Sequence, residues 1–167
     1  MNKKAKNYII ALAILGLILV TSKVDAAKII ADFEGLRLRS YRDSGGIWTV
    51  GYGTTINPDT GLPIKQGDSI TKETALRWLK IQTASVASRV KALIKRSVTD
   101  NQLAALTSLA YNIGLGAFSR STLLRKLNAG ENSQAIAAEF LKWNKVAGQV
   151  VPGLTNRRKL ESELFLS

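Results

Sequence analysis

The sequence predicts an α+β domain in which a small antiparallel sheet is followed by a set of helices. Residues 47–55 mix β-branched and aromatic residues with glycines, which is typical of a short bent strand or a close backbone approach. Residues typical of helix starts recur after this segment. Residues 27–167 have the length of a single domain with one core. Strands that precede a run of helices indicate the α+β class.

A helix is predicted before the sheet. Its apolar and charged residues fall on opposite faces, with Ile29, Ile30 and Phe33 on one and Lys28 and Asp32 on the other. Gly35 favours the left-handed conformation that ends a helix. Glu34 then lies in the last turn, where the helix dipole and partial burial both disfavour a carboxylate. Both effects favour the protonated form that a general acid needs.

Asp43 and Thr49 follow in a different environment. Asp43 lies in the segment Arg-Asp-Ser-Gly-Gly, a turn rich in donors and open to water, which favours an ionised aspartate. The hydroxyl of Thr49, in the predicted strand, is expected to face a water near Asp43. Two carboxyl groups in different surroundings are the minimum for glycosidic cleavage. Singly, each residue has an ordinary structural use, as a solvated helix end, a turn former and a strand residue.

The helical part begins after a turn-rich loop at residues 57–63. Helix starts are predicted at Thr71, Thr99, Ser121, Asn132 and Pro152. The helix after Thr99 is predicted to be central and buried, with apolar residues at helical spacing: Leu103, Leu106, Leu109 and Ala110. Asn112 either caps the end of this helix or points its amide into a substrate cleft.

The composition narrows the chemistry. Lysine and arginine number 24 against 12 acidic residues, so the net charge is +12, a balance that suits a phosphate- or carboxylate-rich partner. The chain carries no sequence typical of nucleic-acid binding, so cell-envelope polyanions are the expected partner and nucleic acid is not. Histidine and cysteine are both absent, which excludes Ser-His and Cys-His catalysis and disulfides. We expect no metal and no cofactor.

The spacing of the three polar residues resembles that of phage-type lysozymes, or endolysins. Their motif is Glu, eight residues, Asp or Cys, five residues, Thr, and Glu34, Asp43 and Thr49 fit it without a gap. Residues 102–114, 121–124, 127–130 and 153–161, with Phe118 and Trp143, also resemble lambdoid endolysins. The resemblance covers the chain from about residue 27 to the C-terminus.

This resemblance implies a lysozyme-like fold, with the active-site cleft between a small sheet lobe and a larger helical lobe, and a monomer that acts on peptidoglycan. It implies Glu34 as general acid, Asp43 as the group that orients or activates water, and Thr49 as a water-positioning partner. It also implies inversion at the anomeric carbon, which needs carboxyl groups about 6.5–9.5 Å apart rather than about 5–5.5 Å. Tyr52, Asn112 and Arg157 are the expected substrate-binding residues. One of the adjacent arginines Arg157 and Arg158, with Arg157 as the first choice, is also expected to pair with Glu34.

Residues 1–26 are predicted to be an export segment. Three lysines precede an apolar run at residues 8–20, which at about 1.5 Å per residue spans roughly 20 Å of a roughly 30 Å hydrocarbon core. Two alternatives stay open. Either a signal peptide is cleaved after Ala26, or an uncleaved signal-anchor tethers residues 8–22 to the inner membrane before release, as in signal-anchor-release endolysins. Both export residues 27–167 to the periplasm or cell wall.

The expected reaction is hydrolysis of the β-1,4 bond between N-acetylmuramic acid and N-acetylglucosamine, for lysis of the host cell. Three other functions stay open. A lytic transglycosylase would cleave the same bond without Asp43 and leave anhydro-muramyl products. A non-catalytic wall-binding protein would form no new reducing ends. A membrane-disrupting protein would act through residues 1–23 alone.

Overall fold

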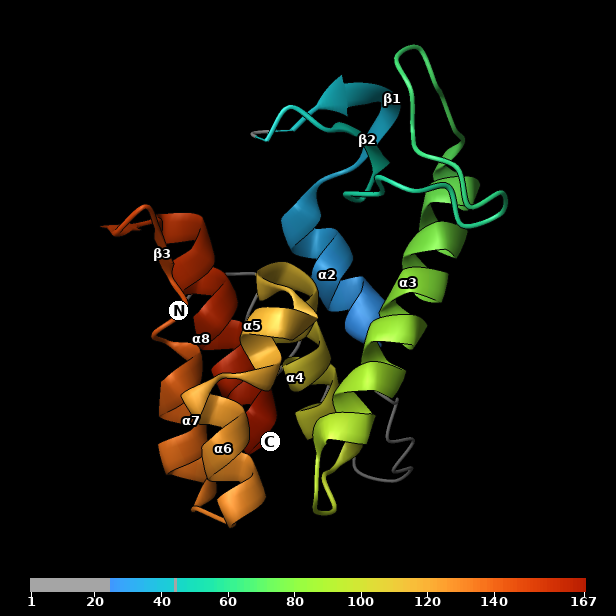
Figure 1. Cartoon of the computed structure of the whole chain (residues 1–167). Helices are drawn as coiled ribbons and strands as arrows, with labels where there is room; N and C mark the ends of the chain where they lie inside the picture. The colour runs from blue at the N-terminus through green and yellow to red at the C-terminus, as the bar shows by residue number, and fades with distance from the viewer. Residues whose placement is uncertain (1–24, 44) are drawn as a thin grey trace, which may run out of the picture.

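The computed structural model describes residues 25–43 and 45–167 of the chain. The elements in chain order are α2 (Ala26–Glu34), β1 (Arg37–Arg42), β2 (Trp48–Gly51), α3 (Lys72–Leu93), α4 (Asp100–Ile113), α5 (Leu115–Ser119), α6 (Thr122–Ala129), α7 (Ser133–Phe140), β3 (Lys145–Val146), β4 (Gln149–Val150) and α8 (Pro152–Leu166). Figure 1 shows a sheet lobe around β1 and β2, a larger helical lobe of α4 to α8, and α3 running beside both. The predicted α+β class is confirmed.

Helix α2 has the predicted position and ends at Glu34. Its N-cap is Asp25, whose Oδ1 accepts a hydrogen bond from the Ala27 amide at 2.9 Å. Gly35 ends the helix with φ 69° and ψ 147°. The positive φ explains the glycine, but the extended ψ differs from the predicted left-handed helical conformation. The buried face is the expected one, with Ile29 and Ile30.

The sheet lobe is built on an antiparallel hairpin. Tyr41 lies opposite Thr49, and the register shifts between Arg37 and Tyr41. Strand β2 covers residues 48–51, so the predicted strand over 47–55 is too long. The close approach expected at its glycines is confirmed at Gly51, where φ is 69° and a Cβ atom would lie 3.3 Å from the Ile70 side chain.

A turn-rich loop connects the sheet lobe to α3, as predicted. The amide of Gly61 donates to the Asn57 carbonyl at 2.8 Å. The Asp59 carboxylate accepts hydrogen bonds from the side chains of Arg77 and Trp78, both on α3. These bonds fix the loop to the helix, which at 22 residues is roughly 33 Å long.

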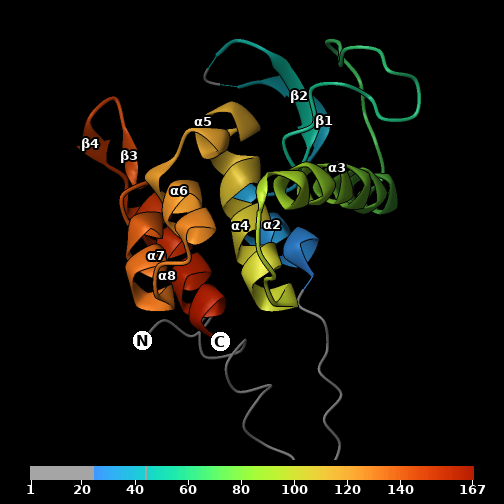
Figure 2. The same ribbon diagram turned by 60° about the horizontal axis from the view of Figure 1, so that its bottom comes forward.

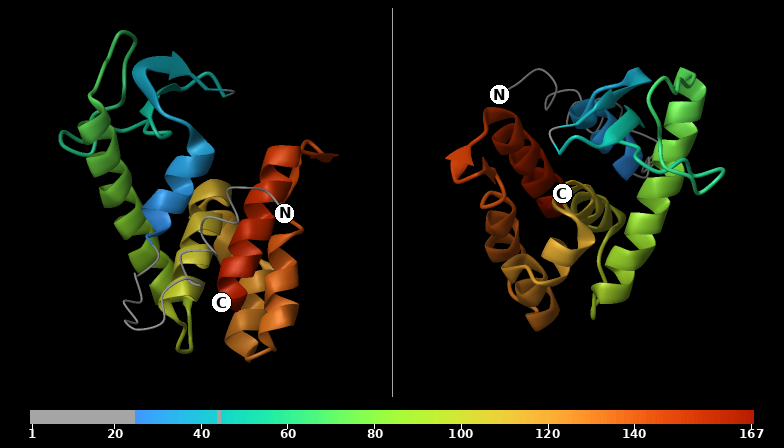
Figure 3. Two further views of the ribbon diagram at one scale, coloured as in Figure 1. Left: turned by 180° about the vertical axis from the view of Figure 1, so that it is seen from behind. Right: turned by 45° about the horizontal axis from the view of Figure 1, so that its top comes forward.

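The helical lobe surrounds α4. All residues of α4 from 104 to 110 are buried, and this helix packs against both α3 and α8. Figure 2 shows α4 between α3 and the group of α6, α7 and α8, and Figure 3 shows α8 beside α7 from behind. The predicted helix starts are confirmed, since Thr71, Thr99, Ser121 and Asn132 are N-caps and Pro152 opens α8. The core centres on large side chains: Leu106, Leu109, Phe118, Leu123, Phe140 and Phe165.

Two elements have no counterpart in the sequence-based predictions. Helix α5 has five residues, too few for a periodic pattern. The β3–β4 hairpin turns at Ala147, with φ 48°, and Gly148, with φ 81°. Alanine is unusual at positive φ, so the sequence does not indicate this tight turn.

The predicted export segment lies almost wholly outside the described residues, which begin at Asp25. Within residues 25–43 and 45–167, no helix is both long and apolar enough to cross a membrane. The predicted cleavage point after Ala26 falls inside the first turn of α2.

Candidate active site

Glu34 stands at the junction of the two lobes. Its side chain is 24% exposed, and its Oε1 accepts a hydrogen bond from Arg157 Nη1 of α8 at 2.7 Å. Its Oε2 lies 3.9 Å from the position that a Cβ atom on Gly53 would take, just after β2. One carboxylate oxygen therefore contacts the helical lobe and the other lies by the sheet lobe.

Two predicted features of the Glu34 environment are present, namely its place in the last turn of α2 and its partial burial. The structure adds the Arg157 guanidinium, a cation at hydrogen-bond distance from the carboxyl group.

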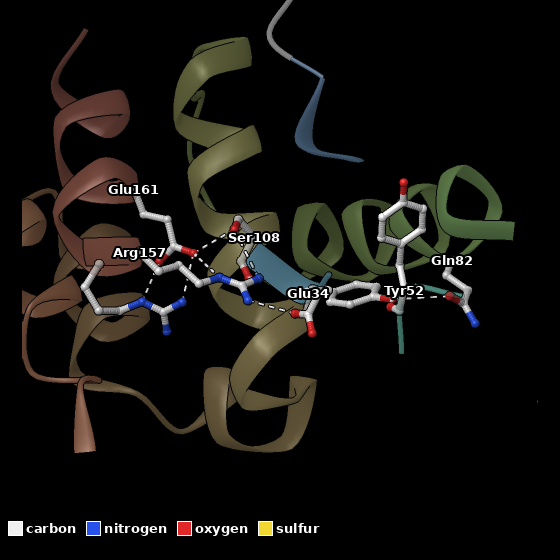
Figure 4. A network of polar contacts seen from close by, with 8 residues as sticks. Glu34, Tyr52, Gln82, Ser108, Arg157 and Glu161 are labelled. Atoms are coloured by element: carbon white, nitrogen blue, oxygen red, sulfur yellow. Dashed lines mark hydrogen bonds and ion pairs between the residues drawn. The ribbon is translucent and has the colours of Figure 1, made fainter. Parts of the chain in front are cut away.

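Arg157 is buried and uses all three of its nitrogens, as Figure 4 shows. Nη1 donates to Glu34, Nε donates to Glu161 Oε1 at 3.2 Å, and Nη2 donates to the Ser108 carbonyl of α4 at 3.2 Å. The guanidinium carbon also lies 5.5 Å from the centre of the Phe33 ring. These contacts from three elements fix the plane of the guanidinium.

Glu161 and Arg158 form a fully buried ion pair behind Arg157. Arg158 Nε lies 2.8 Å from Glu161 Oε2, and Ser108 Oγ donates to Glu161 Oε1 at 2.6 Å. Burial raises the pKa of Glu161, against the effect of the two guanidiniums. Burial also lowers the pKa of Arg158 to about 10, with Glu161 opposing that shift.

Asp43 and Thr49 are joined through the backbone of Ile47. Asp43 Oδ1 accepts hydrogen bonds from the amides of Gly45 and Ile47, both at 2.9 Å. Thr49 is buried, and its hydroxyl donates a hydrogen bond to the Ile47 carbonyl at 3.1 Å. The donor-rich turn that the sequence predicts around Asp43 is therefore present, and the two amides orient its carboxyl group. The hydroxyl proton of Thr49 points to the backbone, so toward a water this oxygen acts as an acceptor.

Tyr111 of α4 connects the helical lobe with the sheet lobe. Its hydroxyl group donates a hydrogen bond that two acceptors share, the Tyr52 carbonyl at 3.2 Å and Gln82 Oε1 at 3.3 Å. Burial raises the pKa of Tyr111 to about 12, and the nearby charge of Glu34 adds to this, while Arg157 opposes it. The phenol therefore stays protonated and keeps this connection at neutral pH.

The expectations for the remaining site residues have different outcomes. The pairing of Arg157 with Glu34 is confirmed. Tyr52 is 7% exposed and packs with Ile30 in the core, and its substrate contact stays a prediction. The capping alternative for Asn112 is wrong because Gly114 is the C-cap of α4. Asn112 is exposed in the last turn, and its substrate contact stays a prediction.

Three residues of the network are absent from the sequence-based candidates: Ser108, Tyr111 and Glu161. Arg157, Arg158 and Glu161 have the i, i+3 and i+4 spacing of ion pairs on one helix. That spacing was a usable indication for Glu161. The roles of Ser108 and Tyr111 depend on how α4 packs, which no local pattern reveals.

A separate cavity of about 480 Å³ lies where the start of α2 meets α3 and α4. Its walls are mostly small side chains, including Ala84, Ala87 and Thr107. It contains none of the predicted catalytic residues, which are grouped instead around the end of α2 and the β1–β2 turn.

Comparison with known proteins places this arrangement in a family. The chain matches the family model of phage lysozyme over residues 31–161. It is 45% identical over 143 residues to an endolysin of Acyrthosiphon pisum secondary endosymbiont phage 1, covering 83% of this chain and 93% of that relative. It is 36% identical to a SAR-endolysin of Enterobacteria phage P21, covering 80% and 77%. It spans about half, 51%, of the length of a Bacillus phage B103 endolysin to which it is 43% identical.

A solved structure agrees with these sequence relatives. The endolysin from Escherichia coli O157:H7 phage FAHEc1 superimposes with a TM-score of 0.77 at 37% identity, covering 91% of this chain and 96% of that one. The chain therefore belongs to the phage lysozyme family and has the lysozyme-like α+β fold. Membership in this family makes it a lytic enzyme directed at the bacterial cell wall.

Proposed function

We propose that this protein is a muramidase that hydrolyses the β-1,4 bond between N-acetylmuramic acid and N-acetylglucosamine in peptidoglycan. The observation that carries the proposal is Glu34, a partly exposed carboxyl group between the two lobes, with one oxygen bound by Arg157. A carboxyl held in one orientation beside a sugar oxygen is what general acid catalysis needs.

In this mechanism Glu34 gives its proton to the leaving glycosidic oxygen. Arg157 occupies Oε1, so the proton leaves from Oε2, the oxygen beside Gly53. Glycine at position 53 keeps this side of the carboxyl free of a side chain, since a Cβ atom there would contact Oε2. As the proton leaves, Arg157 stabilises the carboxylate that forms.

Asp43 supplies the opposite half of the reaction. Its Oδ1 is bound by two backbone amides, which orient the carboxylate and leave Oδ2 to accept a proton from water. Thr49 accepts the second hydrogen of that water and orients it toward the anomeric carbon. The water oxygen bonds to that carbon, its proton goes to Asp43, and the bond to the leaving oxygen breaks, which gives inversion.

We further propose that residues 8–22 stay on the chain and tether it to the inner membrane before release to the periplasm. The start of α2 supports this proposal, because cleavage after Ala26 would remove the Asp25 N-cap and leave a charged amino group at the positive end of the helix. That helix positions Glu34. Expression with export, followed by mass measurement of the membrane-bound protein, tests it. An intact chain of 18.1 kDa is expected, and a mass lacking residues 1–26 would contradict it.

The chemistry is tested by digesting purified peptidoglycan with the full-length chain and identifying the products by mass spectrometry. Hydrated fragments with reducing muramic ends are expected. Anhydro-muramyl products would show a transglycosylase instead, and no products would show a wall-binding protein. Proton NMR of the first product formed is expected to show the α-anomer, because inversion of a β bond gives α.

A further inference from the structure

We propose that Glu161 is a positioning residue for the reaction, which holds the Arg157 guanidinium in place against Glu34 and shares its positive charge. This inference rests on the proposed function, because it assigns a task to a residue behind the proposed general acid. Glu161 is fully buried, so it acts through Arg157 and not on the substrate.

Hydrogen bonds fix the Arg157 guanidinium at Nε, next to the alkyl chain, as well as at its terminal nitrogens. Glu161 Oε1 receives three donors: Arg157 Nε at 3.2 Å, Arg158 Nη2 at 2.9 Å and Ser108 Oγ at 2.6 Å. The bond to Nε and the bond from Nη2 to the Ser108 carbonyl together set the direction of the guanidinium. Nη1 then reaches Glu34 at 2.7 Å. Without Glu161, Arg157 keeps only its Nη2 contacts with Ser108 in the helical lobe, and the bond that fixes Nε is lost.

The charges form an alternating series from the site into the core. Glu34 is followed by Arg157, then Glu161, then Arg158, so the four formal charges cancel. An unpaired charge at this depth would be strongly destabilising, and Arg158 allows Glu161 to be buried as an anion. Each charged residue in the series is therefore neutralised by a neighbour, and Arg158 neutralises Glu161.

Arg157 pairs with both Glu34 and Glu161, so the charge on Glu161 affects the electrostatic environment of Glu34. Arg157 and Arg158 of α8 and Tyr111 of α4 interact electrostatically with Glu34. Gln82 of α3, which lies near this tyrosine, is neutral. Facing Glu161 are Arg157, Arg158 and Ser108, while Glu139 of α7 is bound elsewhere by Lys126 and Lys142. Removal of the Glu161 charge would leave Arg157 with Glu34 as its one anionic partner among these groups. The full charge of the Arg157 guanidinium would then act on the Glu34 carboxyl group.

The test compares Glu161→Gln with two further variants of the full-length chain. Arg158→Met combined with Glu161→Leu removes the ion pair but keeps side chains of similar volume, which generally preserves stability. Glu139→Gln is the matched control, since Glu139 is 4% exposed and pairs with two lysines away from the site. Initial rates on soluble peptidoglycan fragments give kcat and KM across the pH range, and urea unfolding gives stability.

For Glu161→Gln we expect kcat at neutral pH to fall about tenfold to a hundredfold with little change in KM, as for a misplaced catalytic group. The alkaline limb of its pH–rate profile should also differ from that of the wild type, because the charge beside Glu34 changes. The double variant should lose kcat similarly while it unfolds near the wild-type urea concentration. Glu139→Gln should lose stability but keep the wild-type kcat and pH profile.

The inference is overturned if the double variant is stable and has the wild-type kcat and pH profile, since Glu161 is then merely structural. Glu34→Gln, measured beside these variants, separates this failure from that of the proposed function. An inactive Glu34→Gln with a normal double variant rejects the role of Glu161 alone. An active Glu34→Gln rejects the proposed function itself.

Discussion

Replacement of Arg157 by alanine is expected to destabilise the fold as well as the site. The side chain is 3% exposed, and the change removes its bonds to Glu34, Glu161 and the Ser108 carbonyl. A buried ion pair that loses one partner typically costs about 3–5 kcal/mol. The expected loss lies near the lower end, about 3 kcal/mol, because Glu161 keeps Arg158 and Glu34 is 24% exposed.

Urea unfolding followed by circular dichroism measures this loss. Domains of this kind have free energies of unfolding of about 5–15 kcal/mol, so the variant should still fold at low urea concentration. Lys159→Ala is the control, because Lys159 is exposed on the same helix and its loss should change stability by at most about 0.5 kcal/mol. A loss below about 1 kcal/mol for Arg157→Ala would mean that Arg157 behaves like a solvated surface residue, and the reasoning would be refuted.

Three further predictions concern stability. Hydrogen bonds from Arg77 and then Trp78 lower the pKa of Asp59 from 3.8 to about 2. The folded pKa is therefore the lower one, so this contribution is complete above about pH 4 and is lost as the pH falls toward 2. Asp59→Asn should flatten the pH–stability curve in that range, and an unchanged curve would contradict this. Phe118→Ala empties a fully buried position and should cost about 3–5 kcal/mol in urea unfolding, where a loss under about 1 would indicate an adaptable core. Asp25→Ala removes the α2 cap and should lower the free energy of unfolding in urea by about 1 kcal/mol. An unchanged value would mean that this cap does not stabilise the fold.

Local sequence patterns predict much of this fold because its elements start with side chains that satisfy free backbone amides. Thr99, for example, forms a reciprocal capping box with Gln102, and Asn132 caps α7 with a bond to the Ala135 amide at 2.8 Å. Such bonds join residues three apart, so they are visible in the sequence. The β3–β4 hairpin departs from this rule, since Ala147 adopts a positive φ without a local reason.

The site was predictable to the extent that its residues carry a spacing. Glu34, Asp43 and Thr49 lie within a short segment, and the helix end and the turn that hold them are local features. The network behind Glu34 is not local, because the bond from Arg157 joins residues 123 positions apart. The burial of Tyr52 is not local either, because residues of α2 and α3 pack against this aromatic side chain.

The most direct test of the account is the rate of peptidoglycan hydrolysis by full-length Glu34→Gln relative to wild type. Glutamine keeps the size of the side chain and its contact with Arg157 but has no proton to give at neutral pH. We expect the free energy of unfolding in urea to stay within about 1 kcal/mol of the wild-type value. The rate of hydrolysis should be at least about a thousandfold lower. A folded variant with near wild-type activity would contradict the assignment of Glu34 as the general acid.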